Sequence, residues 1–344
     1  MNLRKLPNAG SLTTPLGFGC AYIVGGFEQR KSTSLIHAAL DAGVRHFDVA
    51  PSYGLGTAED ALGVALVGRR SEATIASKAG LSRPNVSRTV MLGRVLVGPL
   101  RKRVLGLTGF LGRTFVQNQR GQFSVAEIER SLSETLRRLK TDHLDLFLLH
   151  DAQSDDLSDE LLRFMETVRQ NGVALAIGVA SERSTCETIA SNNPNLFDVF
   201  QYSWSALAPT ALPIPGVEFV ITHRAILNAL HLTSDWLARD PEARLRLSSA
   251  TGFDLGSENA IADVLLGAAL AANVSGIVLA ASRNAERVRH LGDVMRSEEI
   301  LVAGAKLVRA ILSEDGRPRL QAVADESVGK TVNIRSTEIK DEGF

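Results

Sequence analysis

Short apolar segments alternate with segments of helical periodicity along nearly the whole chain, and this alternation limits the possible fold more than any other feature. The helical segments carry ordinary start and stop signals, such as Gly43 directly after the first one. The predicted strands are Leu16–Cys20, Val44–Val49, Thr74–Ser77, Leu144–Leu149, Leu175–Val179, Asp198–Gln201, Val217–Thr222 and Gly276–Ala280. The predicted helices are Ser32–Ala42, Thr57–Val67, Ser124–Leu139, Leu157–Asn171, Ser184–Ala190, Asn259–Ala272 and Ala285–Met295.

Eight buried strands with intervening helices favour a closed parallel barrel, a single-domain (β/α)8 TIM barrel, over an open doubly wound sheet. An open sheet that binds a dinucleotide usually shows a glycine-rich phosphate loop after its first strand. The stretch Gly17-Phe18-Gly19-Cys20 is no such loop, and nothing after Gly25 resembles one.

Thr57 is a plausible helix N-cap, and Ser124 with Glu127 has the pattern of a capping box.

Two long stretches interrupt the alternation, residues 79–123 and residues 223–257, the second with some helical character at Leu230–Ala238. In a barrel both follow a strand, so we expect them to be long loop insertions on the C-terminal face of a barrel formed by residues 1–313. Residues 314–344 read as a polar C-terminal tail. The first stretch is rich in arginine and is either part of a wall for an anionic or polyhydroxy substrate or a solvated flap.

Composition excludes several classes of protein. The 38 basic and 38 acidic side chains balance, and no nucleic-acid-binding signature is present. No secretory leader or membrane-spanning apolar run is found, and Cys20 and Cys186 lack partners at disulfide or metal spacing. We therefore expect a cytoplasmic monomer or homodimer with no metal, no nucleic-acid partner and no membrane attachment.

Four chemically capable side chains fall at the carboxyl ends of neighbouring predicted strands, where barrel enzymes place their active sites: Asp48, Tyr53, Lys78 and His150. Each alone has a structural explanation, as a turn cap, a packed ring, a rim charge or a satisfied histidine. Together they form a unit, because an ammonium beside a phenol stabilises the phenolate and lowers the phenol pKa. A carboxylate keeps the ammonium charged, and an imidazole can orient a carbonyl oxygen.

These residues stand in motifs that resemble the aldo-keto reductase superfamily: Asp48-x-Ala50-x-x-Tyr53-Gly54, Ala76-Ser77-Lys78 and Leu148-Leu149-His150-Asp151. The segment from Ser131 to Leu146 resembles the same superfamily. The long stretch at 79–123, after the third predicted strand, is similar to an insertion in its sugar and pyridoxal dehydrogenase-like members. The resemblance implies hydride transfer between a nicotinamide cofactor and a small carbonyl or polyol substrate. It assigns Tyr53 as general acid or base and Lys78, with Asp48 as its partner, as the group that adjusts the pKa of Tyr53. It assigns His150 as the group that orients the substrate.

The resemblance also implies cofactor contacts, with departures. It assigns Gln201 and Ser181 to the carboxamide, and Asp48, Cys20 and Ala21 to the cofactor side of the site, although Ala180 stands where a polar residue is usual. The seventh predicted strand ends in His223-Arg224 in place of an aromatic residue followed by Ser-Pro-Leu. His223 can stack as the usual aromatic does, or both side chains can face elsewhere.

The eighth predicted strand leads into Ser282-Arg283-Asn284-Ala285-Glu286-Arg287, which resembles the family's phosphate-binding run. The alignment leaves open whether Ser282 or Arg283 takes the usual serine position. Arg283 and Arg287 near a helix N-terminus suit an adenosine 2′-phosphate, so NADP is favoured and NAD is possible. The arginines can alternatively be surface charges.

Two other classes of function remain open at this stage. One is a non-catalytic nicotinamide-binding regulatory subunit, which the departures on the cofactor side favour. The other is a lyase that uses Lys78 as a Schiff-base amine in a barrel, which the neighbouring Asp48 disfavours because it holds the lysine protonated.

Overall fold

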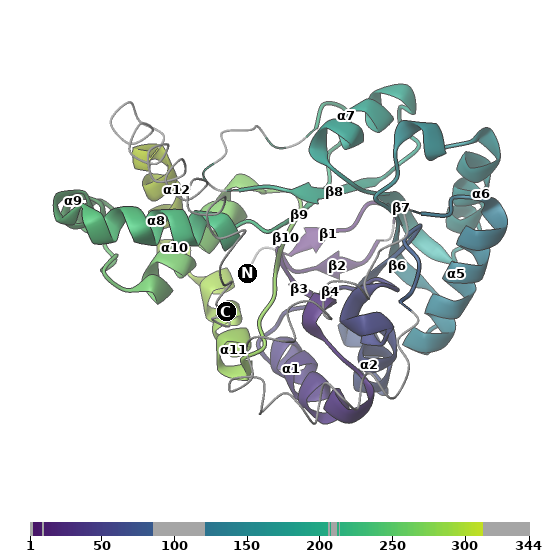
Figure 1. The fold of residues 1–344 in the computed structure, drawn as a ribbon, viewed down its shortest axis with the longest axis horizontal. Helices are drawn as coiled ribbons and strands as arrows, with labels where there is room; N and C mark the ends of the chain where they lie inside the picture. The colour runs from purple at the N-terminus through teal and green to yellow at the C-terminus, as the bar shows by residue number, and fades with distance from the viewer. Residues whose placement is uncertain are drawn as a thin grey trace, which may run out of the picture.

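Eight parallel strands close into a barrel in the order β10-β3-β4-β5-β6-β7-β8-β9 (Figure 1). The computed structural model describes residues 3–8, 10–84, 121–205, 207, 212 and 214–311. The strands are β3 Leu16–Gly19, β4 His46–Asp48, β5 Thr74–Ala79, β6 Leu144–His150, β7 Ala174–Ala180, β8 Val199–Ser203, β9 Val220–His223 and β10 Ile277–Ala280. The predicted (β/α)8 barrel is confirmed, and each predicted strand corresponds to one of these.

Helices follow most of the strands and cover the outside of the barrel (Figure 1). Those that were predicted are α1 Gln29–Asp41, α2 Ala58–Ala65, α5 Val125–Leu139, α6 Asp159–Gln170, α7 Arg183–Asn192, α10 Glu258–Ala272 and α11 Ala285–Arg296. The described residues between β8 and β9 contain no helix. Within the described ranges, no helix combines the length and apolar character that crossing a membrane requires.

Most of residues 223–257 form two helices, α8 Leu227–Arg239 and α9 Pro241–Thr251, where a long loop with some helical character at Leu230–Ala238 was predicted. The helical character at Leu230–Ala238 is confirmed, whereas α9 was missed. The start of α9 has a clear local cause. The side chain of Asp240 accepts a hydrogen bond from the backbone N–H of Ala243 at 2.9 Å. Pro241 stands in the first turn, where a backbone N–H has no partner within the helix, so the missing N–H of proline costs no hydrogen bond. The corresponding insertion at 79–123 lies mostly outside the described residues, as does the tail at 314–344.

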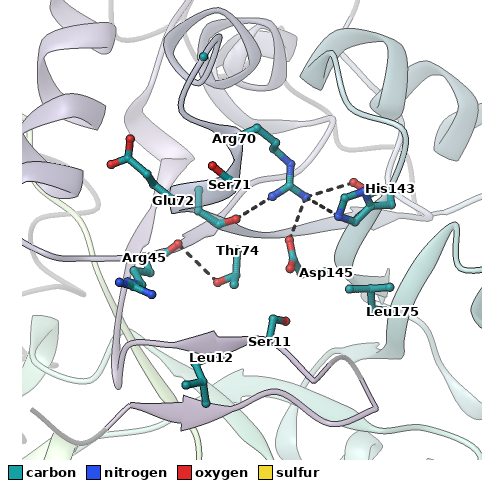
Figure 2. Close-up of a pocket in the computed structure, with 12 residues that line it drawn as sticks. Ser11, Leu12, Arg45, Arg70, Ser71, Glu72, Thr74, His143, Asp145 and Leu175 are labelled. Atoms are coloured by element: carbon teal, nitrogen blue, oxygen red, sulfur yellow. Dashed lines mark hydrogen bonds and ion pairs between the residues drawn. The ribbon is translucent and has the colours of Figure 1, made fainter.

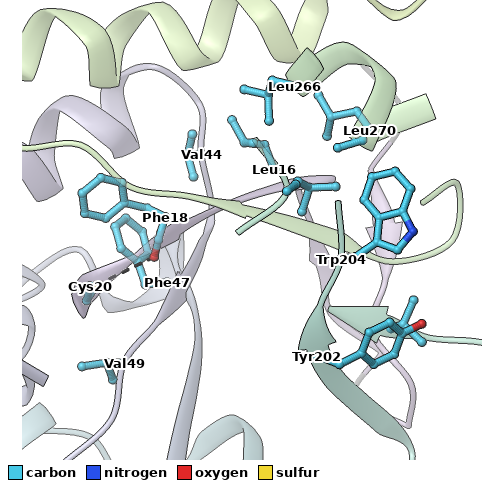
Figure 3. Close-up of a cluster of buried hydrophobic side chains, with 14 of the residues drawn as sticks. Leu16, Phe18, Cys20, Val44, Phe47, Val49, Tyr202, Trp204, Leu266 and Leu270 are labelled. Atoms are coloured by element: carbon cyan, nitrogen blue, oxygen red, sulfur yellow. Dashed lines mark hydrogen bonds between the residues drawn. The ribbon is translucent and has the colours of Figure 1, made fainter. Parts of the chain in front are cut away.

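Two separate apolar clusters make up the core. The inner one fills the barrel and consists of Leu6, Ala76, Leu146, Leu148, Ala176, Ala180, Val199, Phe219, Ile221, Ile277 and Leu279. Leu6 belongs to the hairpin of β1 (Arg4–Lys5) and β2 (Leu12–Thr13), which was not predicted. The outer cluster lies between strands and helices, and Figure 3 shows Phe18 and Phe47 there, with ring centroids 6.1 Å apart in edge-to-face contact.

The two predicted N-caps use their hydroxyl groups differently from the prediction. Thr57 Oγ1 donates to Gly54 O at 2.7 Å and accepts from Gly25 N at 2.9 Å, so it braces the turn before α2 instead of capping that helix. Ser124 Oγ bonds the Glu127 carboxylate at 2.9 Å, and no side-chain bond reaches the backbone at the start of α5. Both helices do begin beside these residues, so the start signals were correct although the capping bonds were not.

The last described helix, α12 (Glu298–Ile311), was missed and packs closely on α10. Glycines permit this approach. A Cβ on Gly304 would meet the backbone of Ala268 and Val264, and a Cβ on Gly267 would meet the backbone carbonyl of Ile300. Backbone atoms cannot move aside as a flexible side chain can, so the contact requires glycine on both helices.

We predict that Gly304→Ala lowers the free energy of unfolding by about 1–3 kcal/mol, because overpacking outweighs the gain in helix propensity. Urea unfolding measures the change, with the half-exposed Val302→Ala on the same helix as the control. A Gly304→Ala protein as stable as wild type, or more stable, would contradict this description of the α10–α12 contact.

Candidate active site

The inward-facing rows of several strands end in polar side chains at the carboxyl end of the barrel. Successive side chains alternate between the two faces of a strand, so residues two apart share a face. Ala76, Leu148, Val199 and Ile221 belong to the inner cluster, and the residues two positions further on are Lys78, His150, Gln201 and His223. Four strands therefore direct the predicted groups to one end of the barrel interior.

Tyr53 reaches the same end from a short 3-10 turn, Tyr53–Gly56, that follows β4. Three consecutive residues of this turn, Gly54, Leu55 and Gly56, have positive φ of 55°, 57° and 83°. Gly54 has no alternative, because a Cβ there would collide with the carbonyl oxygen of Ile23. The turn that carries Tyr53 thus requires glycine at the next position, Gly54.

Lys78 and Asp48 form a buried ion pair below Tyr53. Lys78 Nζ donates to Asp48 Oδ1 at 2.7 Å and to Oδ2 at 2.6 Å, and the two residues are 1% and 2% exposed. The same ammonium lies 3.4 Å from Tyr53 Oη and 4.9 Å from the centre of its ring. Removing either charge would leave the other buried without a partner, so the pair persists as a unit.

Burial, rather than the ammonium, dominates the pKa of Tyr53. Burial raises this pKa, and Lys78 lowers it by charge and hydrogen bonding, with a net value above the ordinary one. The expected lowering by Lys78 is therefore present but is outweighed, and the phenol carries its proton at neutral pH. For Lys78, burial lowers the pKa, but the charge of Asp48 and their hydrogen bonds raise it further, so the ammonium stays charged.

His150 lies beside Tyr53, with ring centroids 6.1 Å apart and planes at 87°. Burial, followed by the charges of Lys78 and His223, lowers the pKa of His150 to about 3. The pKa of His223 is lowered to about 4 by burial, Lys78 and Arg224. Both imidazoles are therefore neutral at neutral pH.

Several buried polar atoms at this end of the barrel have no hydrogen-bond partner within the described part of the chain. They are Gln201 Oε1, Ser181 Oγ, His150 Nδ1 and His223 Nδ1. Buried polar groups are normally paired, so such a cluster fits a site that a polar ligand completes. A carboxamide, which has both donors and an acceptor, matches Gln201 and Ser181, whose backbones are joined by a 3.0 Å hydrogen bond.

The remaining predicted cofactor residues are placed unevenly. Cys20 is fully buried, with its thiol 3.8 Å from Phe18 O, while Ala21 is exposed at the rim. Burial raises the pKa of the Cys20 thiol. Arg224 is exposed with a positive φ of 56°, so it does not point into the barrel as His223 does.

At the end of β10 the structure separates the roles of Ser282 and Arg283. Ser282 Oγ accepts from Asn284 N at 3.1 Å and belongs to the turn, while the Arg283 guanidinium lies over the Tyr22 ring at 4.7 Å. Arg287 hydrogen-bonds to Asn259. The sequence reasoning missed Tyr22, and no local pattern could have found it, because the two residues meet only when the barrel closes between β10 and β3.

A second recess lies at the opposite end of the barrel, beside the first residues of β5, β6 and β7 (Figure 2). It has a volume of about 760 Å³ and contains none of the predicted site residues. Arg70 is paired there, with its Nη2 3.0 Å from Asp145 Oδ2 and its Nη1 2.7 Å from Ala73 O. Across the described ranges, no group of side chains is arranged to hold a metal ion.

The fold and site together define a class of protein, a (β/α)8 barrel with a Tyr-Lys-Asp-His unit at the carboxyl ends of its strands. Residues 15–209, more than half of the chain, match the family model described as Aldo/keto reductase family. The chain belongs to this family.

Individual relatives match over about half of the chain. D-threo-aldose 1-dehydrogenase of a Pseudomonas species is 33% identical over 198 residues, 55% of this chain and 56% of that protein. Pyridoxal 4-dehydrogenase of Microbacterium luteolum is 30% identical over 151 residues, 43% of this chain and 42% of that protein. The matched stretch thus spans about half the length of these curated relatives.

Solved structures extend the likeness of fold to almost the whole chain. An aldo-keto reductase of Bacillus halodurans in its holo form has a TM-score of 0.63 at 21% identity, covering 94% of this chain and 96% of that one. The glycerol dehydrogenase of Gluconobacter oxydans has the same TM-score at 19% identity, covering 99% and 98%. At this level of identity the comparison concerns the fold alone.

Stability should fall as the pH drops from about 6.5 toward 4. Burial lowers the pKa of His46 and His150 to about 3 and of His223 to about 4, whereas an unfolded histidine keeps its usual value near 6.5. In this window the unfolded state binds more protons than the folded state, so stability rises with pH.

Replacing one of these three histidines tests the predicted pH dependence of stability. His46→Gln should reduce the slope of unfolding free energy against pH by about 1.4 kcal/mol per pH unit near pH 5, because one proton fewer is taken up. Urea unfolding at several pH values measures the slope, with the exposed His231→Gln as control. An unchanged slope for His46→Gln would contradict the assignment.

Proposed function

We propose that this protein is an NAD(P)-dependent oxidoreductase that transfers a hydride between nicotinamide and the carbonyl carbon of a small aldehyde, ketone or sugar. The reverse reaction oxidises the corresponding alcohol. The observation that carries the proposal is the approach of the Lys78 ammonium, held by Asp48, to within 3.4 Å of Tyr53 Oη beside His150. Membership in the aldo/keto reductase family supports it.

Tyr53 serves as the general acid in the reducing direction and as the general base in the oxidising direction. The phenol holds its proton at neutral pH and can donate it to the carbonyl oxygen as negative charge develops there. The phenolate that results lies beside the Lys78 ammonium, which stabilises it. Asp48 keeps that ammonium charged and fixed in direction.

His150 orients the substrate. A neutral imidazole can donate one N–H, and its buried Nδ1 has no partner in the part of the chain that the structure describes. Its ring stands at 87° to that of Tyr53, so the two groups can approach one carbonyl oxygen from different directions. This arrangement holds the carbonyl in place while Tyr53 supplies the proton.

The cofactor, when bound, supplies or receives the hydride. Gln201 and Ser181 would hold its carboxamide, and His223, as a flat neutral ring, would take the place of the aromatic that stacks under nicotinamide in similar enzymes. Arg283 and Arg287 would bind its phosphates, which favours NADP over NAD. An aldo-keto reductase of Klebsiella pneumoniae with the same fold has been solved in complex with NADP, which is compatible with this preference.

The substrate class follows from the relatives. Their names refer to an aldose and to pyridoxal, both polar carbonyl compounds, so we propose a small polar carbonyl or polyol substrate for this chain. The Arg-rich segment at 79–123 lies mostly outside the described residues, and its role as part of a wall for an anionic or polyhydroxy substrate stays a prediction, with a solvated flap as the alternative. A Schiff-base role for Lys78 is opposed by its raised pKa, because an amine must lose its proton to attack a carbonyl.

We propose that the protein is located in the cytoplasm and is a monomer or a homodimer. In support, Cys20 and Cys186 are both buried and unbonded, which suits a reducing compartment. The barrel domain would extend over residues 1–313, with 314–344 as a tail.

Tyr53→Phe should abolish turnover, a loss of at least about a thousandfold in kcat, because the neighbouring His150 is neutral and does not release its N–H proton to the carbonyl oxygen. Fluorescence titration should show NADPH affinity within about threefold of wild type, since the phenyl ring still fills the space. Tyr202→Phe is the matched control, because the Tyr202 hydroxyl is buried without a partner among the described residues and lies outside the site. Full activity in Tyr53→Phe would remove Tyr53 from the mechanism.

Arg283→Ala should weaken NADPH binding by about ten- to a hundredfold and leave NADH binding within about threefold, because a charge-assisted phosphate contact is lost. The exposed Arg289→Ala, on the helix α11 that follows Arg283, controls for a general loss of positive charge. If both cofactors weaken equally, or neither does, Arg283 does not select the 2′-phosphate.

A further inference from the structure

A fully buried carboxylate lies directly behind the turn that carries Tyr53. Glu59, in the first turn of α2, is 0% exposed. Its Oε1 accepts hydrogen bonds from Ser77 Oγ at 2.9 Å and from Thr135 Oγ1 at 2.8 Å. Its Oε2 pairs with the guanidinium of Arg83, whose side chain is 18% exposed. One carboxylate therefore joins β5, α5 and the segment that follows β5.

Arg83 extends this network to the turn itself. Its Nη1 donates to the carbonyl oxygen of Gly56, the last residue of the Tyr53–Gly56 turn, at 2.5 Å. A Cβ on Gly56 would stand 3.0 Å from Arg83 Cγ, so the side chain lies against the backbone of the turn. The Nε of Arg83 is 3.8 Å from Glu134 Oε1, which adds a second negative partner.

The Tyr53–Gly56 turn contains a strained backbone conformation that these hydrogen bonds can stabilise. Leu55 has a positive φ of 57°, a conformation that residues other than glycine adopt uncommonly. Thr57 Oγ1 holds the carbonyl of Gly54, and Arg83 holds the carbonyl of Gly56. The two bonds bracket the strained residue.

The network also reaches the strand that carries Lys78. Ser77 and Lys78 are neighbours in β5 and point to opposite faces, so Ser77 bonds Glu59 outside the barrel while Lys78 bonds Asp48 inside it. The 3.4 Å separation of Lys78 Nζ and Tyr53 Oη is near the upper limit of a hydrogen bond, so a small displacement of the turn breaks it.

We propose that Arg83 and Glu59 are positioning residues for the reaction, which hold the Tyr53 turn in register with Lys78. They touch neither substrate nor cofactor and act through Tyr53. This inference rests on the proposed role of Tyr53 as the proton donor.

The chain offers a closely matched control at the other end of the barrel. Arg70 pairs with the buried carboxylate of Asp145 and donates to the backbone carbonyl of Ala73, as Arg83 pairs with Glu59 and donates to Gly56 (Figure 2). The side chains of Arg70 and Asp145 are 23% and 6% exposed, close to those of Arg83 and Glu59. Arg70→Met therefore removes the same kind of interaction far from Tyr53.

The experiment compares Arg83→Met, Glu59→Gln and Arg70→Met in the full chain. For Arg83→Met and Glu59→Gln we expect kcat to fall about ten- to a hundredfold, with NADPH affinity from fluorescence titration within about threefold of wild type. Arg70→Met should retain kcat within about threefold, although it loses stability as the others do. Arg83→Lys, which keeps the charge and one of the two bonds, should recover part of the lost kcat.

A second readout does not depend on turnover. The chain has three tyrosines, so the difference in ultraviolet absorbance between each protein and its Tyr53→Phe form follows the ionisation of Tyr53 alone. Loosening the turn weakens the contact with Lys78, which raises the pKa of the phenol, but it also admits water, which lowers that pKa. Burial is the largest cause of the raised pKa of Tyr53, so this pKa should move down toward the ordinary value in Arg83→Met and stay unchanged in Arg70→Met. Arg83→Lys is measured in the same way and keeps the test possible if Arg83→Met does not fold.

The outcomes separate the hypotheses. If kcat and the Tyr53 ionisation are unchanged in Arg83→Met and Glu59→Gln, or change equally in Arg70→Met, the positioning role is wrong. If wild type binds no nicotinamide cofactor and reduces no carbonyl, the proposed function fails, while the shift in Tyr53 ionisation still decides whether Arg83 holds the turn.

Discussion

The buried ion pair between Lys78 and Asp48 is the interaction on which the rest of the site depends. Two charges that are almost fully removed from water are costly unless each finds its partner in good geometry, and here two hydrogen bonds of 2.7 and 2.6 Å join them. Strands β4 and β5 bring them together, because Asp48 pairs with Ala76 across the sheet and Lys78 stands two residues further along. Every other group acts relative to this fixed ammonium.

Opposing effects at this pair set the protonation states that the chemistry needs. Burial raises the pKa of Tyr53 and lowers that of His150, so the first is a protonated donor and the second a neutral ring. The ammonium reduces the cost of forming the phenolate without making it the resting form. A site with stronger exposure to water would lose both effects, which is why the barrel interior suits this reaction.

The barrel and the positions of its catalytic groups could be predicted from the sequence, because both depend on local periodicity. Alternation within β5 and β6 places Lys78 and His150 at strand ends, and these positions follow from counting residues along each strand. The helix α9 was missed, although Asp240-Pro241 is a start signal, because residues 223–257 were taken as a loop insertion with helical character only at Leu230–Ala238. The helix α12, which follows α11, was missed as well.

The contacts that support Tyr53 could not be predicted in the same way. Glu59 receives bonds from Ser77 and Thr135, which stand 18 and 76 residues away, so only the folded chain brings them together. The stacking of Arg283 on Tyr22 is likewise a product of barrel closure. Such contacts have no sequence period, whereas the residues that carry the chemistry do.

The central claim is that the carboxyl end of this barrel binds a nicotinamide cofactor beside Tyr53, and titration of the wild-type protein with NADPH tests it most directly. Trp204 and Trp236 are both buried, so quenching of their emission and energy transfer to the reduced nicotinamide report binding. We predict saturable binding of one NADPH per chain. An emission spectrum that stays unchanged with both NADPH and NADH, together with no cofactor retained in equilibrium dialysis, would contradict it.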